Sequence, residues 1–254
     1  MNQLYVMLLI ALFFAACATS EQPNIEYGKA IQRDKKLSRI EKDDKVFIEI
    51  IRDQQERVAE IRQYSEYLEK PQVTTYRYNK DNQLIERNYW EDYIDYYTYK
   101  NGRLTEMSIE NKNHPEWKRR FVYHYDDKNR ISKADIYKIK TKTGFILFEY
   151  DENNNTTTRK EYALEYPESV FAEYKFSYTD GLNPLSELYL QPLDIYQQNN
   201  PASSYFHTMV MASMPTTIFS EYEFDENGYP ISKIDTPKSD YQQFTQTRYT
   251  FFYR

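Results

Sequence analysis

The sequence predicts an all-β protein, an antiparallel meander of repeated hairpins that forms a strongly curved sheet or a barrel-like fold. Three observations support this prediction: a recurring pair of aromatic residues, a polar turn after each pair, and alternation of rings with charges. The chain has 27 tyrosines and 14 phenylalanines but only 5 glycines in 254 residues. Aromatic residues favour strands, and a repeat of this kind indicates an array of similar structural units.

Residues 1–16 are predicted to be a signal peptide. The run 4–16 carries no charge; it is shorter than the ~20 residues of a membrane helix and typical of a secretory signal. Ala15-Ala16-Cys17 looks like a lipobox, at which bacteria lipidate the cysteine and cleave before it. Two features depart from the usual pattern: no Lys or Arg precedes the run, and Phe14 stands where Leu is usual.

Cys17 is therefore the predicted lipid-attachment residue, and the membrane is a predicted partner through that lipid. Two or more acyl chains anchor a protein stably. Ala18 rather than Asp follows the cysteine, which by the usual sorting rule of Gram-negative bacteria indicates the outer membrane. The alternative is an ordinary signal peptide that ends at a cysteine by chance. Cys17 is the only cysteine, so the chain can form no internal disulfide.

After the anchor, we expect a flexible tether over residues 17–35 and a repetitive antiparallel β domain over residues 36–254. The net charge is −6, and the two signs are interspersed along the chain. Nucleic-acid binding requires a basic face, so we expect no nucleic-acid partner. We also expect no cofactor and no metal.

The start of the β domain is open to two interpretations. Residues 46–51 and 57–61 fit the two strands of a degenerate hairpin. Val58, Ile61 and Leu68 also fit helical spacing, and Gln, Glu and Arg favour helix. We favour strands for residues 46–68, because the pattern that begins at Arg57 repeats the one that begins at Arg103.

The repeat unit consists of two aromatics separated by one residue, a polar turn, an aliphatic residue and a mixed strand. The second aromatic is followed by residue 79, 100, 126, 151, 179, 225 and 254 in successive units. The steps are roughly 25 residues, except from 179 to 225, and such a step fits two strands and two turns. The turns contain Asp, Asn and Gly, which tolerate left-handed conformations, and Asn101-Gly102 is the pair that tight hairpins prefer.

Period-2 alternation predicts one continuous aromatic face. Phe121, Tyr123 and Tyr125 share a face, and the same alternation recurs in the other units. A buried tyrosine needs a partner for its hydroxyl, so we expect a thin sheet or a partly hydrated barrel interior. The opposite face carries charges such as Glu149 and Glu173, which disfavours a membrane-spanning barrel with an apolar outer band.

The long step contains two less regular segments. Asn183 and Pro184 predict the N-cap and first residue of a short helical stretch between residues 183 and 200. The uncharged stretch 195–220 is interpreted as a loop or a short packed segment, because it contains Asn199-Asn200-Pro201.

Tyr123-His124-Tyr125-Asp126 followed by Arg130-Ile131 resembles the YD repeat of Rhs-type proteins. The fuller order is a lipobox, Tyr-x-Tyr hairpins, Asn183-Pro184, and Met214-Pro215-Thr216 before the segment 221–230. It is similar to a family of uncharacterised lipoproteins of Gram-negative gut-type bacteria described as having a porin-like β fold. The likeness covers residues 36–254 and implies no activity, because that family has no established one. Rhs proteins also build their toxin shells from far longer arrays.

No residue set in the sequence amounts to a catalytic or metal site. His114, His124 and His207 match no ligand spacing; His124 is expected to point to the polar face and His207 to lie in the uncharged loop. Carboxylates are numerous, so the carboxylate pair of a hydrolase stays an alternative.

Aromatic residues in or near the connections have binding potential. They are Tyr89, Trp90, Tyr93, Tyr96 and Trp117. Such rings stack on sugars, dock a partner, or simply cap the ends of the aromatic core. The leading hypothesis is a non-enzymatic, lipid-anchored envelope protein that binds a ligand or partner, either a glycan or an envelope protein. The alternatives are a hydrolase acting on envelope or dietary polymers and a purely structural envelope component.

Overall fold

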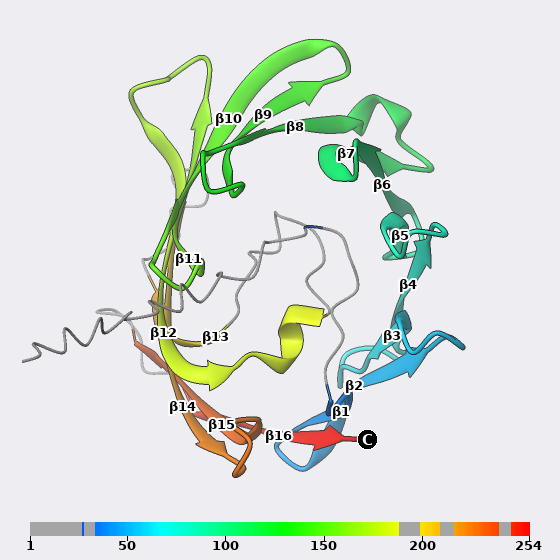
Figure 1. Ribbon diagram of the computed structural model, residues 1–254, viewed down its shortest axis with the longest axis vertical. Helices are drawn as coiled ribbons and strands as arrows, with labels where there is room; N and C mark the ends of the chain where they lie inside the picture. Colours follow the sequence, from blue (N-terminus) through cyan, green and yellow to red (C-terminus); the bar gives the residue numbers. More distant parts are fainter. Residues whose placement is uncertain (1–26, 28–33, 188–198, 209–215, 239–244) are drawn as a thin grey trace, which may run out of the picture.

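The computed structural model describes residues 27, 34–187, 199–208, 216–238 and 245–254, and their strands close into an antiparallel barrel (Figure 1). Each strand pairs with its neighbours in the sequence, so the predicted all-β meander is confirmed. The first and last strands also pair, with Ile40 opposite Phe251. The fold is therefore a closed barrel rather than an open curved sheet.

The barrel has sixteen strands within the described ranges, and two short 3-10 helices interrupt the connections. The strands are β1 (Leu37–Lys42), β2 (Lys45–Arg52), β3 (Val58–Gln63), β4 (Gln72–Tyr78), β5 (Leu84–Tyr89), β6 (Tyr93–Lys100), β7 (Arg103–Asn111), β8 (Arg119–Tyr125), β9 (Ile131–Lys138), β10 (Thr141–Tyr150), β11 (Thr156–Ala163), β12 (Val170–Leu182), β13 (Asn199–Thr208), β14 (Thr216–Phe224), β15 (Pro230–Lys238) and β16 (Thr247–Tyr253). The helices are η1 (Pro115–Trp117) and η2 (Pro184–Glu187).

The first three strands settle the choice between strand and helix at the start of the domain. β1 and β2 are joined by a two-residue turn in which Asp43 and Asp44 both have positive φ. β2 and β3 pair with Ile50 opposite Ile61. The strand interpretation is confirmed, because Val58 and Ile61 are held by pairing across the sheet.

The predicted aromatic face lines the inside of the barrel. Phe121 and Tyr123 are buried, whereas His124 between Tyr123 and Tyr125 is exposed. The buried cluster on this face comprises Tyr27, Leu84, Tyr97, Leu104, Met107, Phe121, Tyr123, Ile131, Ala134, Ile146 and Phe148. The continuous layer with constant register is therefore present across β5 to β10.

Tyr27 belongs to the N-terminal part of the chain and lies inside the barrel, against the aromatic face. Its side chain is 7% exposed, and its ring packs edge-on against Tyr125, with the centroids 6.2 Å apart. Its hydroxyl lies 3.0 Å from the Tyr150 hydroxyl and accepts the backbone N–H of Ile131. The rest of the expected tether before Asp34 lies outside the described residues.

In most aromatic pairs the second residue is a tyrosine, and its hydroxyl donates a hydrogen bond to the preceding hairpin. Each hydroxyl donates to the backbone carbonyl of the first or second residue in the second strand of that hairpin. Six pairs follow this pattern in the described strands: Tyr78 to Val58 (2.9 Å), Tyr99 to Leu84 (2.8 Å), Tyr125 to Leu104 (2.6 Å), Tyr150 to Ile131 (2.8 Å), Tyr178 to Thr156, and Tyr253 to Pro230 (2.8 Å).

These tyrosines replace backbone pairing where adjacent hairpins separate. Between β7 and β8 the last backbone pair before the turns joins Glu106 and Val122. Glu106 comes two residues after Leu104, and Val122 comes three residues before Tyr125. The same offsets hold at the other five bonds. A buried carbonyl without a donor is costly, so the hydroxyl completes the hydrogen bonding at the end of each ladder. This explains why the aromatic face uses tyrosine here.

The turns after the aromatic pairs are organised by their first side chain. Asp126 Oδ1 accepts the backbone N–H groups of Lys128 and Arg130, and Oδ2 accepts the Arg130 Nε–H at 2.8 Å. Asn129 has φ 62°, a left-handed conformation that Asn tolerates. The Arg130 guanidinium then lies over the Tyr150 ring, 4.8 Å from its centroid, so one turn is connected to the next hairpin.

The long step between units contains two strands, β13 and β14, as the other steps do. β13 and the first five residues of β14 lie within the stretch 195–220, so its interpretation as a loop is wrong for residues 199–208 and 216–220. The Asn183 side chain accepts the Leu185 N–H, so Asn183 and Pro184 start η2 as predicted. η2 lies inside the barrel (Figure 1), where Leu185 packs against the cluster around Leu37. Residues 188–198 lie outside the described ranges.

Candidate functional site

The predicted site residues lie in different parts of the chain. Cys17 lies outside the described residues, so its lipidation stays a prediction. His124 points to the outer face as predicted, where its Nε2 lies 3.0 Å from Asp135. His114 lies in the turn before η1, whereas His207 lies on β13, so its expected place in a loop is wrong. In the described part of the chain, no group of three or more His, Cys, Asp or Glu residues is arranged to hold a metal ion.

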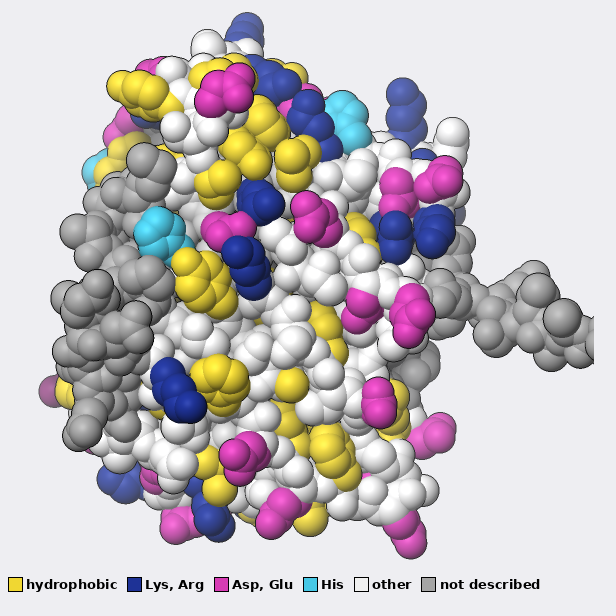
Figure 2. All heavy atoms as spheres, turned by 90° about the vertical axis from the view of Figure 1, so that its left-hand side faces the viewer, with side chains coloured by type: hydrophobic (Ala, Val, Ile, Leu, Met, Phe, Trp, Pro, Cys, Tyr) yellow, Lys and Arg dark blue, Asp and Glu magenta, His cyan; other side chains and the backbone are white. Residues whose placement is uncertain are grey.

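The outer face of the barrel is rich in ion pairs. Asp135 on β9 is paired with Lys133 (3.3 Å) and Lys142 (2.8 Å) in addition to His124. Burial alone would raise the pKa of Asp135, but hydrogen bonds from Lys142, His124 and Lys133 lower it to about 2. Figure 2 shows acidic and basic side chains interspersed with apolar ones over one side of the barrel. This face therefore mixes charged side chains with hydrophobic ones, some of which contact each other, as Phe145 and Tyr162 do.

Three carboxylates on described strands face the inside of the barrel, and each of the three is paired with a cation. Asp95 on β6 is fully buried, and Arg87 Nη2 lies 2.7 Å from its Oδ2. Two further inward pairs are Arg159 with Glu161 on β11, and Lys233 with Asp235 (2.7 Å) on β15. The hydrolase hypothesis predicts two carboxylates that face each other across a cleft. These three carboxylates face cations instead.

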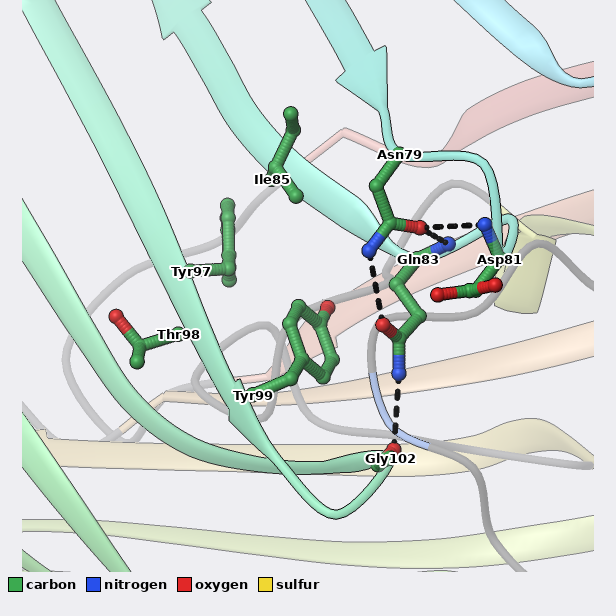
Figure 3. A pocket seen from close by; sticks show the side chains of 8 residues that line it. All are labelled: Asn79, Asp81, Gln83, Ile85, Tyr97, Thr98, Tyr99 and Gly102. Atoms are coloured by element: carbon green, nitrogen blue, oxygen red, sulfur yellow. Dashed lines mark hydrogen bonds between the residues drawn. The ribbon is translucent and has the colours of Figure 1, made fainter.

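A first pocket, of 580 Å³, lies where the hairpins β4–β5 and β6–β7 separate (Figure 3). Gln83 bridges the gap by donating its Nε2–H to the carbonyl of Gly102 at 2.9 Å. The Asn79 side chain accepts the backbone N–H groups of Asp81 and Gln83 and donates to the Gln83 side chain. The polar groups drawn in Figure 3 thus hold the two turns together, so this pocket has a structural explanation.

A second pocket, of 680 Å³, lies at the other end of these strands, between the β3–β4 connection and the β5–β6 turn. Aromatic and apolar residues form part of its wall, and polar residues form the rest. It is lined by Leu68, Glu69, Lys70, Pro71, Gln72, Val73, Thr75, Asn88, Tyr89, Trp90 and Glu91. We call it the rim pocket. Thr75 and Asn88 are opposite each other on β4 and β5, which places the pocket on the outer side of the barrel wall.

Trp90 is the most exposed aromatic residue of the rim pocket. It is 61% exposed, and its ring meets Tyr89 and Tyr93 edge-on, at centroid distances of 5.5 and 6.1 Å. Tyr89 and Tyr93 stack on each other at 5.7 Å and are opposite each other on β5 and β6. The two tyrosine rings therefore support the indole of Trp90 at the rim of the barrel.

The turn that carries Trp90 has an unfavourable backbone for its residues. Trp90 and Glu91 have φ of 48° and 55°, and Asp92 N–H returns to the Trp90 carbonyl. A left-handed conformation costs ~1–2 kcal/mol for a residue with a Cβ, and Asn-Gly is the usual solution. Asn101-Gly102 follows that rule in the β6–β7 turn of the same barrel. Strained residues of this kind cluster at functional sites.

The structure brings together three of the five aromatics expected at connections. Tyr89, Trp90 and Tyr93 form one cluster, and its two tyrosines also extend the aromatic core to the rim. Tyr96 lies on the outer face of β6. Trp117 lies in η1, 49% exposed, and stacks on His114 with the ring centroids 4.0 Å apart. No sequence pattern indicated that the β3–β4 connection would supply the opposite wall of the pocket.

The class that the geometry defines is a closed, sixteen-stranded antiparallel β-barrel. Among solved structures the chain is similar to a porin-like protein from Bacteroides uniformis, with 12% identity and a TM-score of 0.52, covering 86% of this chain and 96% of that one. A porin-like protein from Bacteroides vulgatus gives 12% identity, a TM-score of 0.51, and coverage of 87% and 99%. At this identity the likeness establishes the fold alone. No protein-family model and no curated protein sequence matches the chain.

Proposed function

We propose that this protein is a non-enzymatic, lipid-anchored protein of the bacterial cell envelope that binds a ligand at the rim pocket. The observation that carries the proposal is the exposed Trp90, held by Tyr89 and Tyr93 beside a pocket of 680 Å³. Binding sites are concave and combine aromatic surface with a few polar groups. The rim pocket has that composition.

The anchor is proposed to be a lipid on Cys17. The supporting observation is the uncharged run 4–16 that ends in Ala15-Ala16-Cys17. Cys17→Ser is expected to move the protein from the membrane fraction to the soluble fraction and to abolish labelling with palmitate. Cys17 is the only cysteine, so no other thiol can carry the lipid. Unchanged membrane association of the variant would refute the anchor.

We propose that the barrel wall faces water. Cross-strand ion pairs such as Arg120 with Glu106, and Lys142 with Asp135, lie on its outer face. In a membrane-spanning barrel that face contacts lipid, where one Lys or Arg at the midplane costs ~2–4 kcal/mol. No helix within the described ranges has the length and hydrophobicity of a membrane span.

Binding at the rim is tested by comparing the two tryptophans of the chain. Trp90→Gly removes the ring and suits the left-handed turn, whereas Trp117→Gly removes an exposed ring outside the pocket. Capture of purified envelope components by the wild-type protein is expected to be lost in the first variant and kept in the second. Equal capture by both variants would contradict the proposal.

A hydrolase that acts on envelope or dietary polymers is the second candidate. It is favoured only by Glu69 and Glu91, two exposed glutamates that both line the rim pocket. Release of products from such a polymer by the wild-type protein, and its loss in Glu91→Gln, would replace the binding proposal. A protein that neither binds nor cleaves would be a structural envelope component.

A further inference from the structure

The rim pocket has a composition that narrows the class of ligand. Its apolar part is the exposed indole of Trp90 beside the exposed aliphatic side chains of Leu68 and Val73. The rest of the wall is polar or charged: Glu69, Lys70, Gln72, Thr75, Asn88 and Glu91. A ligand with only apolar surface would leave these polar groups without partners, which is costly. The ligand must therefore have one apolar face and many hydrogen-bonding groups.

The charge of the pocket argues against strongly anionic ligands. Two glutamates and one lysine line it, and no arginine is among its lining residues. Phosphate and carboxylate recognition uses Arg or clustered cations. A neutral ligand rich in hydroxyl groups suits this wall better than an anion does.

The strained turn gives an independent reason to assign a role to Trp90. The β1–β2 and β6–β7 turns have the same left-handed backbone, with Asp43-Asp44 and Asn101-Gly102, residue types suited to it. Trp90 and Glu91 are less suited to this backbone, as is Ile139 in the β9–β10 turn, so the turn conformation does not itself select for a tryptophan. Tyr89 and Tyr93 contact the indole edge-on, which keeps its orientation fixed. A fixed ring at the edge of a pocket can stack against a flat apolar face.

From these observations we infer that the rim pocket binds a neutral carbohydrate, with one sugar ring stacked on the Trp90 indole. Sugar rings have an apolar face of C–H groups and a rim of hydroxyls, which matches the indole and the polar wall. Asn88 and Gln72 supply amide donors and acceptors for those hydroxyls. This inference deepens the proposed function, since it rests on the same pocket and names its ligand class.

The chain offers a direct optical test, because it has only two tryptophans. Trp117→Phe leaves Trp90 as the sole indole in the full-length lipidated protein, kept in a zwitterionic detergent that has no sugar headgroup. Its emission and iodide quenching are measured with maltohexaose, cellohexaose, mannohexaose and chitohexaose. At least one of these probes is expected to shift the emission to the blue and to protect the indole from iodide. Trp90→Phe, with Trp117 present, is the matched control and is expected to show no such change.

Affinity measurements then separate the stacking from the fold. By calorimetry, Trp90→Gly and Asn88→Ala are each expected to weaken binding of the active oligosaccharide by about tenfold or more, with Trp117→Gly unchanged. Near-UV circular dichroism of each variant checks that the barrel is intact. Binding that survives Trp90→Gly in a folded protein would overturn the inference.

A negative panel also has a defined meaning. If no oligosaccharide protects Trp90 but a purified envelope protein does, the carbohydrate assignment is overturned and the proposed binding function stands. If neither protects Trp90, both are overturned. Protection only by acidic glycans, such as polygalacturonate, would overturn the assignment of a neutral ligand.

Discussion

Tyr125→Phe removes a single hydroxyl and leaves the ring of the aromatic face in place. The lost bond is the donation to the Leu104 carbonyl, which measures 2.6 Å. Leu104 is only 1% exposed, so water has little access to replace the donor. A net hydrogen bond contributes ~0.5–1.5 kcal/mol, and a carbonyl left unsatisfied costs ~1–3 kcal/mol. We therefore expect the free energy of unfolding to fall by about 1–3 kcal/mol.

Urea denaturation followed by circular dichroism measures this change in the free energy of unfolding. Thermal unfolding is expected to show a loss in Tm of roughly 2–4 °C for each kcal/mol. The control is Tyr67→Phe, because Tyr67 is 86% exposed in the β3–β4 connection and should change stability by less than about 0.5 kcal/mol. An unchanged midpoint for Tyr125→Phe would refute the role assigned to the hydroxyl. An equal loss of stability in Tyr67→Phe would refute it as well, because the loss would then come from removing any tyrosine hydroxyl and not from the hydrogen bond at the end of the ladder.

Two further predictions concern the packing and the titration of the same barrel. In Gly181→Ala the new Cβ would meet the outer atoms of the Phe224 ring, which is 36% exposed and can rotate aside, so we expect a loss of only ~0.5–1.5 kcal/mol that is smaller in a Phe224→Ala background. A double-mutant cycle that shows simple additivity would contradict this contact. Burial raises the pKa of Tyr78 and Tyr99 above the ordinary value near 10. The folded state therefore holds these protons more tightly than the unfolded state, so stability is intact below pH ~10 and falls as the pH rises above it. A fraction of the tyrosinate absorbance is expected to appear only together with the loss of the dichroism signal. Ionisation of all tyrosines before the barrel unfolds would count against the burial of Tyr78 and Tyr99.

The sequence was informative wherever hydrophobic alternation was strong. The register of Phe121, Tyr123 and Tyr125 follows from a period of two, because neighbouring side chains in a strand point to opposite faces. The closing pair of β1 and β16 could not be predicted, because alternation defines faces and not the partner of an edge strand. β13 was missed because Asn199-Asn200-Pro201 carries turn-forming residues, and its pairing with β12 outweighs that local preference.

The candidate site was predictable only in part. The exposed aromatics near residue 90 could be singled out, because a tryptophan beside charged residues in a connection is unusual. The wall formed by residues 68–71 could not, since it depends on how the β3–β4 connection folds over the next hairpin. The use of tyrosine hydroxyls to end each ladder also required the register, because acceptor and donor lie 15 to 23 residues apart.

The position of Tyr27 limits how far the barrel can stand from a membrane. Cys17 precedes Tyr27 by ten residues, and ten fully extended residues span at most ~36 Å. Tyr27 is fixed inside the barrel by Tyr150 and Ile131, so the segment after it adds nothing to this reach. A lipid on Cys17, as proposed, would therefore keep the barrel close to the bilayer surface. Its rim would then sample only ligands within a few nanometres of the membrane surface.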